Sequence, residues 1–328
     1  MGDATLKLAL LGTGRIADKQ LAPAIVQAKS VQLWSVLSRE AERADGFASR
    51  HGAASSTPAY TDLGELLRDP ELDGVVIATP DKLHADQATA AARARKHVLV
   101  EKPMATSVAE AEEMVRECDE AGVRLGVAYH LRWHAGHRLI ATGVRNGEFG
   151  DLRHMRVQWT WPAPDDTNWR ARPDVGRWWS LAGVGTHCLD LVRWLMVPRC
   201  GEIDTVRSVI SRSVWEGPHD ETAVVALRLE SGATAELCSS VVFDSPTSLE
   251  VYGSRGYALC TDTFGPQGAG EIRTSLGELR YSPANPYIGE IEDFAAAIRD
   301  GRPPEVDGRE GLRNVELLSL IESDSSSR

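Results

Sequence analysis

The sequence is poor in the features that mark secreted, membrane-spanning and nucleic-acid-binding proteins. It has five cysteines among 328 residues, and none of them forms a Cys-x-x-Cys pair. Scattered cysteines in an odd number exclude a disulfide framework and are typical of a reducing compartment. No apolar run approaches the roughly 20 residues of a membrane-spanning helix. Residues 1–7 have no basic stretch followed by an apolar core, so we expect no signal peptide and a cytoplasmic location.

Positive charge is also scarce. Lysine and arginine number 36 against 47 aspartates and glutamates, which gives a net charge of -11. An acidic chain of this kind excludes a nucleic acid or an anionic membrane as the expected partner and leaves a small molecule. The hydrophobic fraction of 42% and the length are sufficient for two soluble globular domains.

The first 125 residues alternate between short apolar runs and helix-like segments. The runs predict parallel strands at 6–11, 31–37, near 59, and at 74–78, 98–100 and 125–128. Helices are expected up to residue 28 and at 40–51, 63–67, 83–94 and 108–121. This alternation predicts an α/β fold, with a Rossmann dinucleotide-binding domain over residues 1–125.

The remaining residues, 126–328, follow a different pattern. Alternating polarity predicts strands at 154–160, 206–213, 223–229, 234–240 and 248–252, with tight turns that favour antiparallel pairing. Helices are expected at 136–146, 290–299 and 310–321, and residues 323–328 are expected to be frayed. We therefore predict an α+β second domain for substrate binding and oligomerisation.

A glycine-rich turn joins the first strand to the first helix. It reads Gly12-Thr13-Gly14-Arg15-Ile16-Ala17. Gly12 permits a tight turn, Gly14 lets the backbone approach a pyrophosphate, and Ala17 allows close packing of the helix. The free N–H groups of the helix then face the phosphates. A turn that serves packing alone is the alternative.

The end of the second strand bears on the choice of cofactor. An NAD site presents an acid there, whereas an NADP site offers arginine. Ser38 and Arg39 occupy this place, with Arg43 one helical turn further on. The residues favour NADP(H) over NAD(H), unless Arg39 merely faces solvent.

The strand at 98–100 ends in Glu101-Lys102-Pro103. In an open parallel sheet, ligands bind just beyond the carboxyl ends of the strands. A lysine there can donate or accept a proton when burial or neighbouring charge shifts its pKa. The alternative is a surface ion pair that closes the strand.

Four motifs in order resemble the Gfo/Idh/MocA oxidoreductases: Gly12-x-Gly14-x-x-Ala17, Thr79-Pro80-x-x-x-His84, Glu101-Lys102-Pro103 and Gly185-x-His187-x-x-Asp190. The resemblance spans nearly the whole chain. It implies a large open sheet in the second domain, a homodimer or homotetramer, and hydride transfer between a nicotinamide and a carbinol of a sugar, cyclitol or related polyol.

The resemblance also implies roles for single residues. Lys102 would contact the substrate and the nicotinamide ribose, and the Lys102–Pro103 bond is often cis in the family. His187 would be a catalytic or substrate-orienting base; the alternative is a buried histidine satisfied by a backbone carbonyl. An imidazole, with an unperturbed pKa of about 6.5, can serve both reaction directions. We assign further cofactor contacts to Thr79, Pro80, His84 and Glu101, and further substrate contacts to Tyr129, Arg132, Trp169, Arg170 and Trp179.

The chain departs from the family pattern ahead of His187. A family glycine run is replaced by Arg177, Trp178 and Trp179, and Gly183 stands where the family has an aspartate. The tryptophans are either a platform for a sugar ring or core filling. Either Lys102 and His187 suffice without the aspartate, or Tyr129 or Asp190 substitutes for it, or catalysis has decayed.

Two other functions therefore stay open on the same fold: a non-catalytic sensor that binds NAD(P), and a nicotinamide-dependent glycosidase. His130, His134 and His137 lack a nearby carboxylate or cysteine, so we predict solvated or packing histidines and no metal site.

Overall fold

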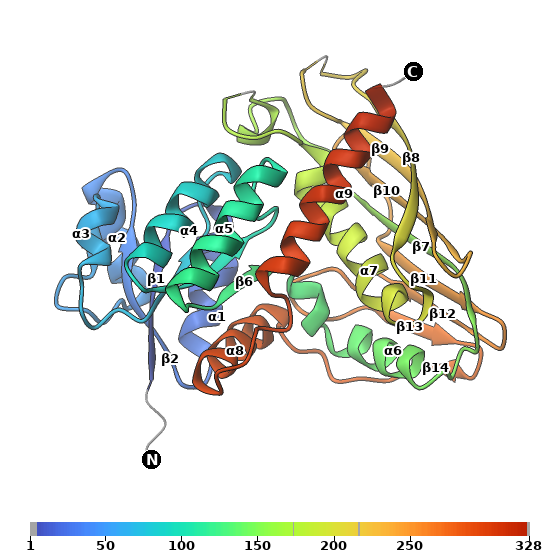
Figure 1. The fold of residues 1–328 in the computed structure, drawn as a ribbon, viewed down its shortest axis with the longest axis horizontal. Coiled ribbons are helices and arrows are strands. Elements are labelled where there is room, and N and C mark those ends of the chain that lie inside the picture. Colours follow the sequence, from blue (N-terminus) through green and yellow to red (C-terminus); the bar gives the residue numbers. More distant parts are fainter. Residues whose placement is uncertain (1–4, 173, 216, 327–328) are drawn as a thin grey trace. The chain divides into compact units, whose positions relative to one another are not determined.

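The computed structural model describes residues 5–172, 174–215 and 217–326. Two predictions fall partly outside these residues: the absence of a signal peptide, made from residues 1–7, and the frayed end at residues 323–328. The chain forms two compact units (Figure 1). Unit 1 comprises Met1–Tyr129 and Tyr287–Val315, and unit 2 comprises His130–Pro286 and Glu316–Arg328. The sequence predicted one boundary, near residue 125, whereas the chain returns to unit 1 at Tyr287. In the described part of the chain, no helix is both long and apolar enough to cross a membrane.

Unit 1 is built on a six-stranded parallel sheet in the order β3-β2-β1-β4-β5-β6. This order confirms the predicted Rossmann fold, whose crevice lies where the order reverses, between β1 and β4. The central strands β1 and β4 are mostly apolar, as expected where helices cover both faces of a sheet. The strands are β1 (Leu6–Leu11), β2 (Val31–Leu37), β3 (Ala59–Tyr60), β4 (Gly74–Ile77), β5 (His97–Glu101) and β6 (Leu125–Ala128).

The helices of unit 1 come from both ends of the sequence. Helices α4 and α5 lie side by side (Figure 1). Tyr287, Ile291 and Phe294 of α8 join a core cluster with Leu8 and Leu99 of the sheet. The helices are α1 (Ala22–Gln27) with a preceding π turn (Ala17–Leu21), α2 (Ala41–His51), α3 (Leu63–Leu67), the 3₁₀ turn η2 (Asp81–Leu83), α4 (His84–Arg93), α5 (Val108–Ala121), α8 (Pro286–Arg299) and the first part of α9 (Gly308–Ser326).

Unit 2 contains an eight-stranded sheet in the order β14-β13-β12-β11-β7-β10-β9-β8. Over the described residues, the β10–β7 pairing of this sheet is parallel and its other strand pairs are antiparallel. The prediction of a large, mainly antiparallel sheet is therefore confirmed. The strands are β7 (Leu152–Thr160), β8 (Ile203–Ser211), β9 (Thr222–Leu229), β10 (Thr234–Ser240), β11 (Ser248–Gly253), β12 (Tyr257–Thr261), β13 (Glu271–Thr274) and β14 (Gly277–Glu278).

Helices α6 and α7 of unit 2 pack together, and α7 also packs on β7 and β10. Helix α6 spans Ala135–Arg145 and follows the 3₁₀ segment η3 (His130–Trp133). Helix α7 (Thr186–Cys200) continues the π turn η5 (Leu181–Gly185).

The end of α9 corrects one expectation. Residues from 323 were expected to be frayed, but the helix continues to Ser326. Ser208 of β8 anchors it, because its hydroxyl donates to the Ile321 carbonyl (2.6 Å) and its N–H donates to the Asp324 carboxylate (2.8 Å).

Candidate active site

The glycine-rich turn of unit 1 has the geometry of a phosphate-binding loop. Gly12 has a φ of +98°, and a Cβ atom built on it would lie 2.6 Å from the Ala78 carbonyl oxygen. Only glycine fits there, since a side chain would strain the backbone and collide with the neighbouring strand. A Cβ on Gly14, in contrast, would have no neighbour within 4 Å, so the space over this turn is open. The turn therefore fits the pyrophosphate of a dinucleotide.

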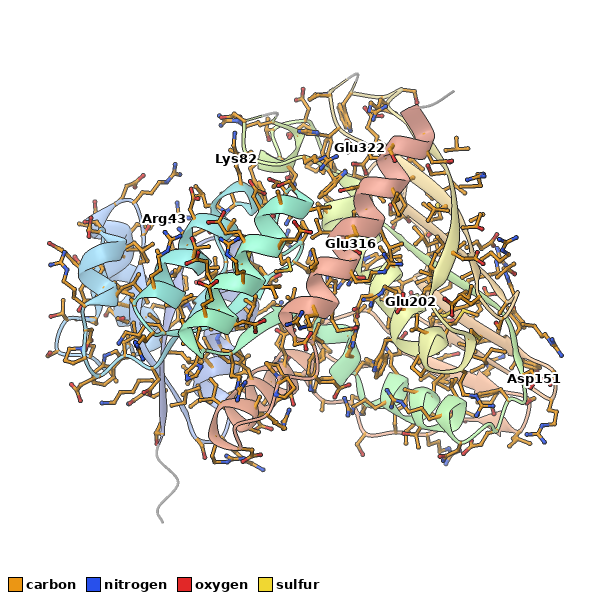
Figure 2. All side chains as sticks on the ribbon, viewed as in Figure 1. Arg43, Lys82, Asp151, Glu202, Glu316 and Glu322 are labelled. Atoms are coloured by element: carbon orange, nitrogen blue, oxygen red, sulfur yellow. The ribbon has the colours of Figure 1, made fainter. Side chains whose placement is uncertain are left out.

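The predicted adenosine end lies next to this turn. The Thr13 and Ser38 hydroxyls are 3.1 Å apart, and Arg43 (labelled in Figure 2) donates to the Thr13 carbonyl at 3.0 Å. Arg39 is exposed and bonds to no other residue in the described ranges. Arg39 is thus available to an anionic group, whereas Arg43 holds the loop.

The Glu101–Lys102–Pro103 segment ends β5 in the interior of the protein. Glu101 and Lys102 are 8% and 9% exposed, so the alternative of a surface ion pair is wrong. The Lys102 N–H donates to the Glu101 carboxylate at 3.2 Å, and the Lys102–Pro103 bond is cis, as the resemblance implies. Burial and the charges of Glu101 and Glu290 raise the pKa of Tyr287 well above its ordinary value.

The Thr79–His84 segment follows β4, the neighbouring strand. Thr79 donates its hydroxyl to the Gln87 side chain at 2.7 Å, and Pro80 precedes the 3₁₀ turn η2. His84 is fully buried, with one ring nitrogen 2.9 Å from the Thr79 carbonyl and the other 2.9 Å from the Pro103 carbonyl. The imidazole therefore links this segment to the turn that carries Lys102.

In unit 2, His187 lies in the first turn of α7. Its ring is 3% exposed and meets two other rings: His130, edge-on at 4.9 Å, and Trp159, tilted at 5.2 Å between centroids. These contacts restrict the orientations that the imidazole can adopt.

Arg132 and Asp190 form a buried ion pair close to His187. Arg132 Nε donates to Asp190 Oδ2 at 2.9 Å, and its terminal nitrogen donates to Oδ1 at 2.6 Å. A bidentate pair of this kind is strong and directional. It fastens η3 to α7 three residues beyond His187. Both carboxylate oxygens of Asp190 accept hydrogen bonds from Arg132. If Asp190 substitutes for the missing aspartate, it does so while it is paired with this arginine.

The tryptophans ahead of His187 are core residues by burial. Trp178 and Trp179 are almost completely buried, and Trp179 packs with Ala163 and Val241 in a small apolar cluster. Arg177 donates to Glu322 of α9 (labelled in Figure 2) at 2.8 Å. Both side chains are thus packed in the interior, in agreement with core filling.

The other predicted substrate contacts differ in their surroundings. Tyr129 follows β6 and is buried, whereas Trp169 and Arg170 belong to the short 3₁₀ turn η4 (Trp169–Ala171) and are partly exposed. The Arg170 guanidinium lies 4.1 Å from the centroid of the Trp169 ring.

No sequence motif pointed to Asp220, which is bonded to the start of η5, the turn that leads into α7. Its carboxylate accepts hydrogen bonds from the Trp179 N–H (2.8 Å), the Leu181 N–H (2.6 Å) and the Ser180 hydroxyl (2.6 Å). A carboxylate at a helix start also interacts favourably with the helix dipole. Burial raises the pKa of Asp220, and these hydrogen bonds oppose the rise.

The three clustered histidines of unit 2 pack in the interior. His130, His134 and His137 are buried, so the expectation of packing histidines holds and that of solvated ones is wrong. Burial lowers the pKa values of His134 and His137. Within residues 5–172, 174–215 and 217–326, no three histidine, cysteine or carboxylate side chains are grouped as metal ligands.

Comparison with known proteins agrees with this geometry. Residues 6–129 match the Gfo/Idh/MocA oxidoreductase family, NAD-binding Rossmann fold, and residues 137–259 match the Gfo/Idh/MocA C-terminal domain. The chain belongs to the Gfo/Idh/MocA family. It is therefore an oxidoreductase of a family of NAD(P)-dependent enzymes that act on sugars and polyols, and its Rossmann unit binds NAD(P).

Individual relatives cover nearly the full length of this family member. The 1,5-anhydro-D-fructose reductase of Ensifer adhaerens is 32% identical over 92% of this chain and 91% of its own. The D-xylose 1-dehydrogenase (NADP(+)) 2 of Haloferax volcanii is 30% identical over 95% of each chain. The crystal structure of the aldose-aldose oxidoreductase of Caulobacter crescentus, with 26% identity, superposes with a TM-score of 0.91 over 98% of both chains.

Proposed function

We propose that this Gfo/Idh/MocA protein transfers a hydride between NADP(H) and a carbinol or ketone of a sugar, cyclitol or related polyol. The observation that carries the proposal is the burial of Lys102 at the carboxyl end of β5, in the sheet that carries the dinucleotide turn. The named activities of the reductase and dehydrogenase relatives support the substrate class.

Lys102 and His187 handle the substrate proton in this proposal. The bound nicotinamide supplies or accepts the hydride. When a carbinol is oxidised, its hydroxyl proton must leave with the hydride, and when a ketone is reduced, the same oxygen must gain a proton. An ammonium polarises that oxygen, and an imidazole can take the proton or give it back.

Replacing Lys102 with alanine tests the proposal directly. We expect the variant to lose about 100-fold or more in kcat across a panel of sugars, inositols and keto-sugars assayed with both cofactors. The matched control is Lys29→Ala, because Lys29 is an exposed lysine of unit 1 for which we propose no role. Equal turnover of the two variants would remove Lys102 from the mechanism.

Other outcomes of that assay separate the alternatives. Cofactor binding without turnover of any substrate would favour the sensor, for which Gly183 is the motivating residue. Release of a leaving group without net change in the cofactor would favour a glycosidase.

The NADP(H) preference is proposed from Arg39. This side chain is exposed and available to a 2′-phosphate, and Ser38 brings no negative charge to the same place. We expect Arg39→Ala to weaken NADP⁺ binding about tenfold and to leave NAD⁺ binding unchanged, because arginine bonds strongly to phosphate. Titration of both cofactors by fluorescence measures the ratio. Arg95→Ala removes an exposed charge elsewhere in unit 1 and serves as the control; a ratio that Arg39→Ala leaves unaltered would contradict the preference.

A further inference from the structure

Both ring nitrogens of His84 lie within hydrogen-bond distance of a backbone carbonyl oxygen. It begins α4, is completely buried, and has each ring nitrogen 2.9 Å from a backbone carbonyl oxygen: Nδ1 from that of Pro103 and Nε2 from that of Thr79. A carbonyl oxygen can only accept a hydrogen bond.

A neutral imidazole cannot satisfy this arrangement. It has one N–H and one lone pair, so it would bond one carbonyl and hold its lone pair against the oxygen of the other. An imidazolium has two N–H groups and donates to both. Charge-assisted hydrogen bonds are also stronger than neutral ones.

His137 in unit 2 shows the contrasting case. Its Nδ1 lies 3.2 Å from the Leu131 carbonyl, but its Nε2 lies 2.8 Å from the Thr263 hydroxyl, which can donate as well as accept. The neutral ring therefore satisfies both contacts. Burial lowers the pKa of His137 well below its ordinary value, in agreement with a neutral ring.

The charges of unit 1 around His84 are compatible with a cation. Asp81 on η2 and Glu101 at the end of β5 are buried acids, and Lys102 is a buried base. A buried acid near the ring favours its charged form. Other titratable groups of unit 1 are Asp86 in the first turn of α4 and Tyr287 on α8, on which the charges of Glu101 and Glu290 act.

We propose that His84 is a positioning residue that stays protonated at neutral pH and, by donating to Thr79 and Pro103, fixes the backbone that carries Lys102. The proposal rests on the function proposed for Lys102. The two hydrogen bonds join the segment after β4 to the segment after β5, and these are adjacent strands of the sheet.

The protonation state can be measured without any substrate. Long-range ¹H–¹⁵N correlation spectra of histidine-labelled protein distinguish an imidazolium, whose two nitrogens are equivalent in type, from a neutral ring with one protonated and one bare nitrogen. We expect His84 to give the imidazolium pattern at pH 7.5 and His137 to give the neutral pattern in the same sample. His84→Gln and His137→Gln assign the signals, with His84→Asn as a second variant if the first does not fold. A neutral His84 at pH 7.5 would overturn the proposal, and so would a wild-type spectrum at that pH with no imidazolium signal at all.

Kinetics of His84→Gln test the positioning role. A glutamine amide can reach one carbonyl but carries no charge, so we expect kcat to fall about 10- to 100-fold while cofactor affinity changes less than about threefold. We also expect the wild-type pH profile of kcat to fall where His84 loses its proton, and this limb to be missing in the variant. An unchanged kcat and profile would refute the role. If the wild type turns over no substrate, the proposed function fails, and the spectra still decide the protonation state of His84.

Discussion

Gly183 is the residue at which this chain departs most clearly from the pattern of its family. It lies in η5, one helical turn before His187, and a Cβ built on it would meet no atom within 4 Å. The position is therefore open for a larger side chain, and the glycine is not required by packing. A substitution of Gly183 can therefore be used to test the role of this position in the reaction without disturbing the packing.

We expect Gly183→Asp to fold as well as the wild type and to raise kcat several-fold. The new carboxylate would lie on the same helical face as His187 and would stabilise an imidazolium there, since opposite charges nearby favour the charged form. Steady-state kinetics measure the change. Gly183→Asn is the matched control, because it has nearly the same volume without the charge. If the two variants have the same kcat, a carboxylate at this position contributes nothing to proton transfer in this chain.

At the scale of elements, helix α7 is the part that sequence patterns could not predict. It is buried on nearly every side, so its apolar residues do not form the stripe by which an amphipathic helix is recognised. Strands β12, β13 and β14 were also missed, whereas β1, β2 and β10 were predicted to the residue. Local periodicity suffices for strands with one or two clearly apolar faces.

The candidate site likewise contains residues that the sequence motifs identified and residues that they did not. The glycine-rich turn and the Glu101–Lys102–Pro103 segment were recognised as motifs because the residues within each are consecutive in the sequence. The Arg132–Asp190 pair joins positions 58 residues apart, and Asp220 reaches residues about 40 positions earlier. Partners at such separations depend on tertiary packing, which a single sequence does not display.

The start of η5, which leads into α7, gives a prediction about stability. Asp220→Asn replaces one carboxylate oxygen by an NH₂ group, which cannot accept from the N–H and hydroxyl donors that face it. We expect the free energy of unfolding to fall by about 2–3 kcal/mol, the usual cost of leaving buried donors unsatisfied. Urea unfolding measures it. Asp244→Asn, at an exposed position, is expected to change stability by less than about 0.5 kcal/mol. Equal stabilities of the two variants would show that Asp220 does not hold the helix.

At the scale of the whole molecule, both units contain histidines whose neutral form is favoured by burial. Burial lowers the pKa values of His97 in unit 1 and of His134 and His137 in unit 2. In the unfolded chain these groups titrate near pH 6.5. As the pH falls below about 6.5, the unfolded state binds protons that the folded state does not, so stability is lost on acidification.

We expect the free energy of unfolding to decrease as the pH falls from about 6.5 to 5.5, by up to about 1.4 kcal/mol per pH unit for each histidine that stays neutral when folded. A His84 that stays protonated has the opposite effect, but only above about pH 6.5, where the unfolded chain loses the proton that the folded chain keeps. His137→Gln should reduce the slope of the unfolding free energy against pH by the contribution of one bound proton, whatever the substitution does to the absolute stability. Urea unfolding at several pH values gives both slopes. Identical slopes for the wild type and the variant would contradict a neutral His137.

The return of the chain to unit 1 has a consequence for synthesis. Tyr287, Ile291 and Phe294 belong to the core around the parallel sheet, so the first 129 residues leave that core incomplete. On the ribosome, every residue of 130–286 is translated before these side chains emerge. The nucleotide-binding unit, although encoded first, therefore completes its folding after the chain of its neighbour has been made, and a nascent fragment that ends near residue 130 exposes apolar surface.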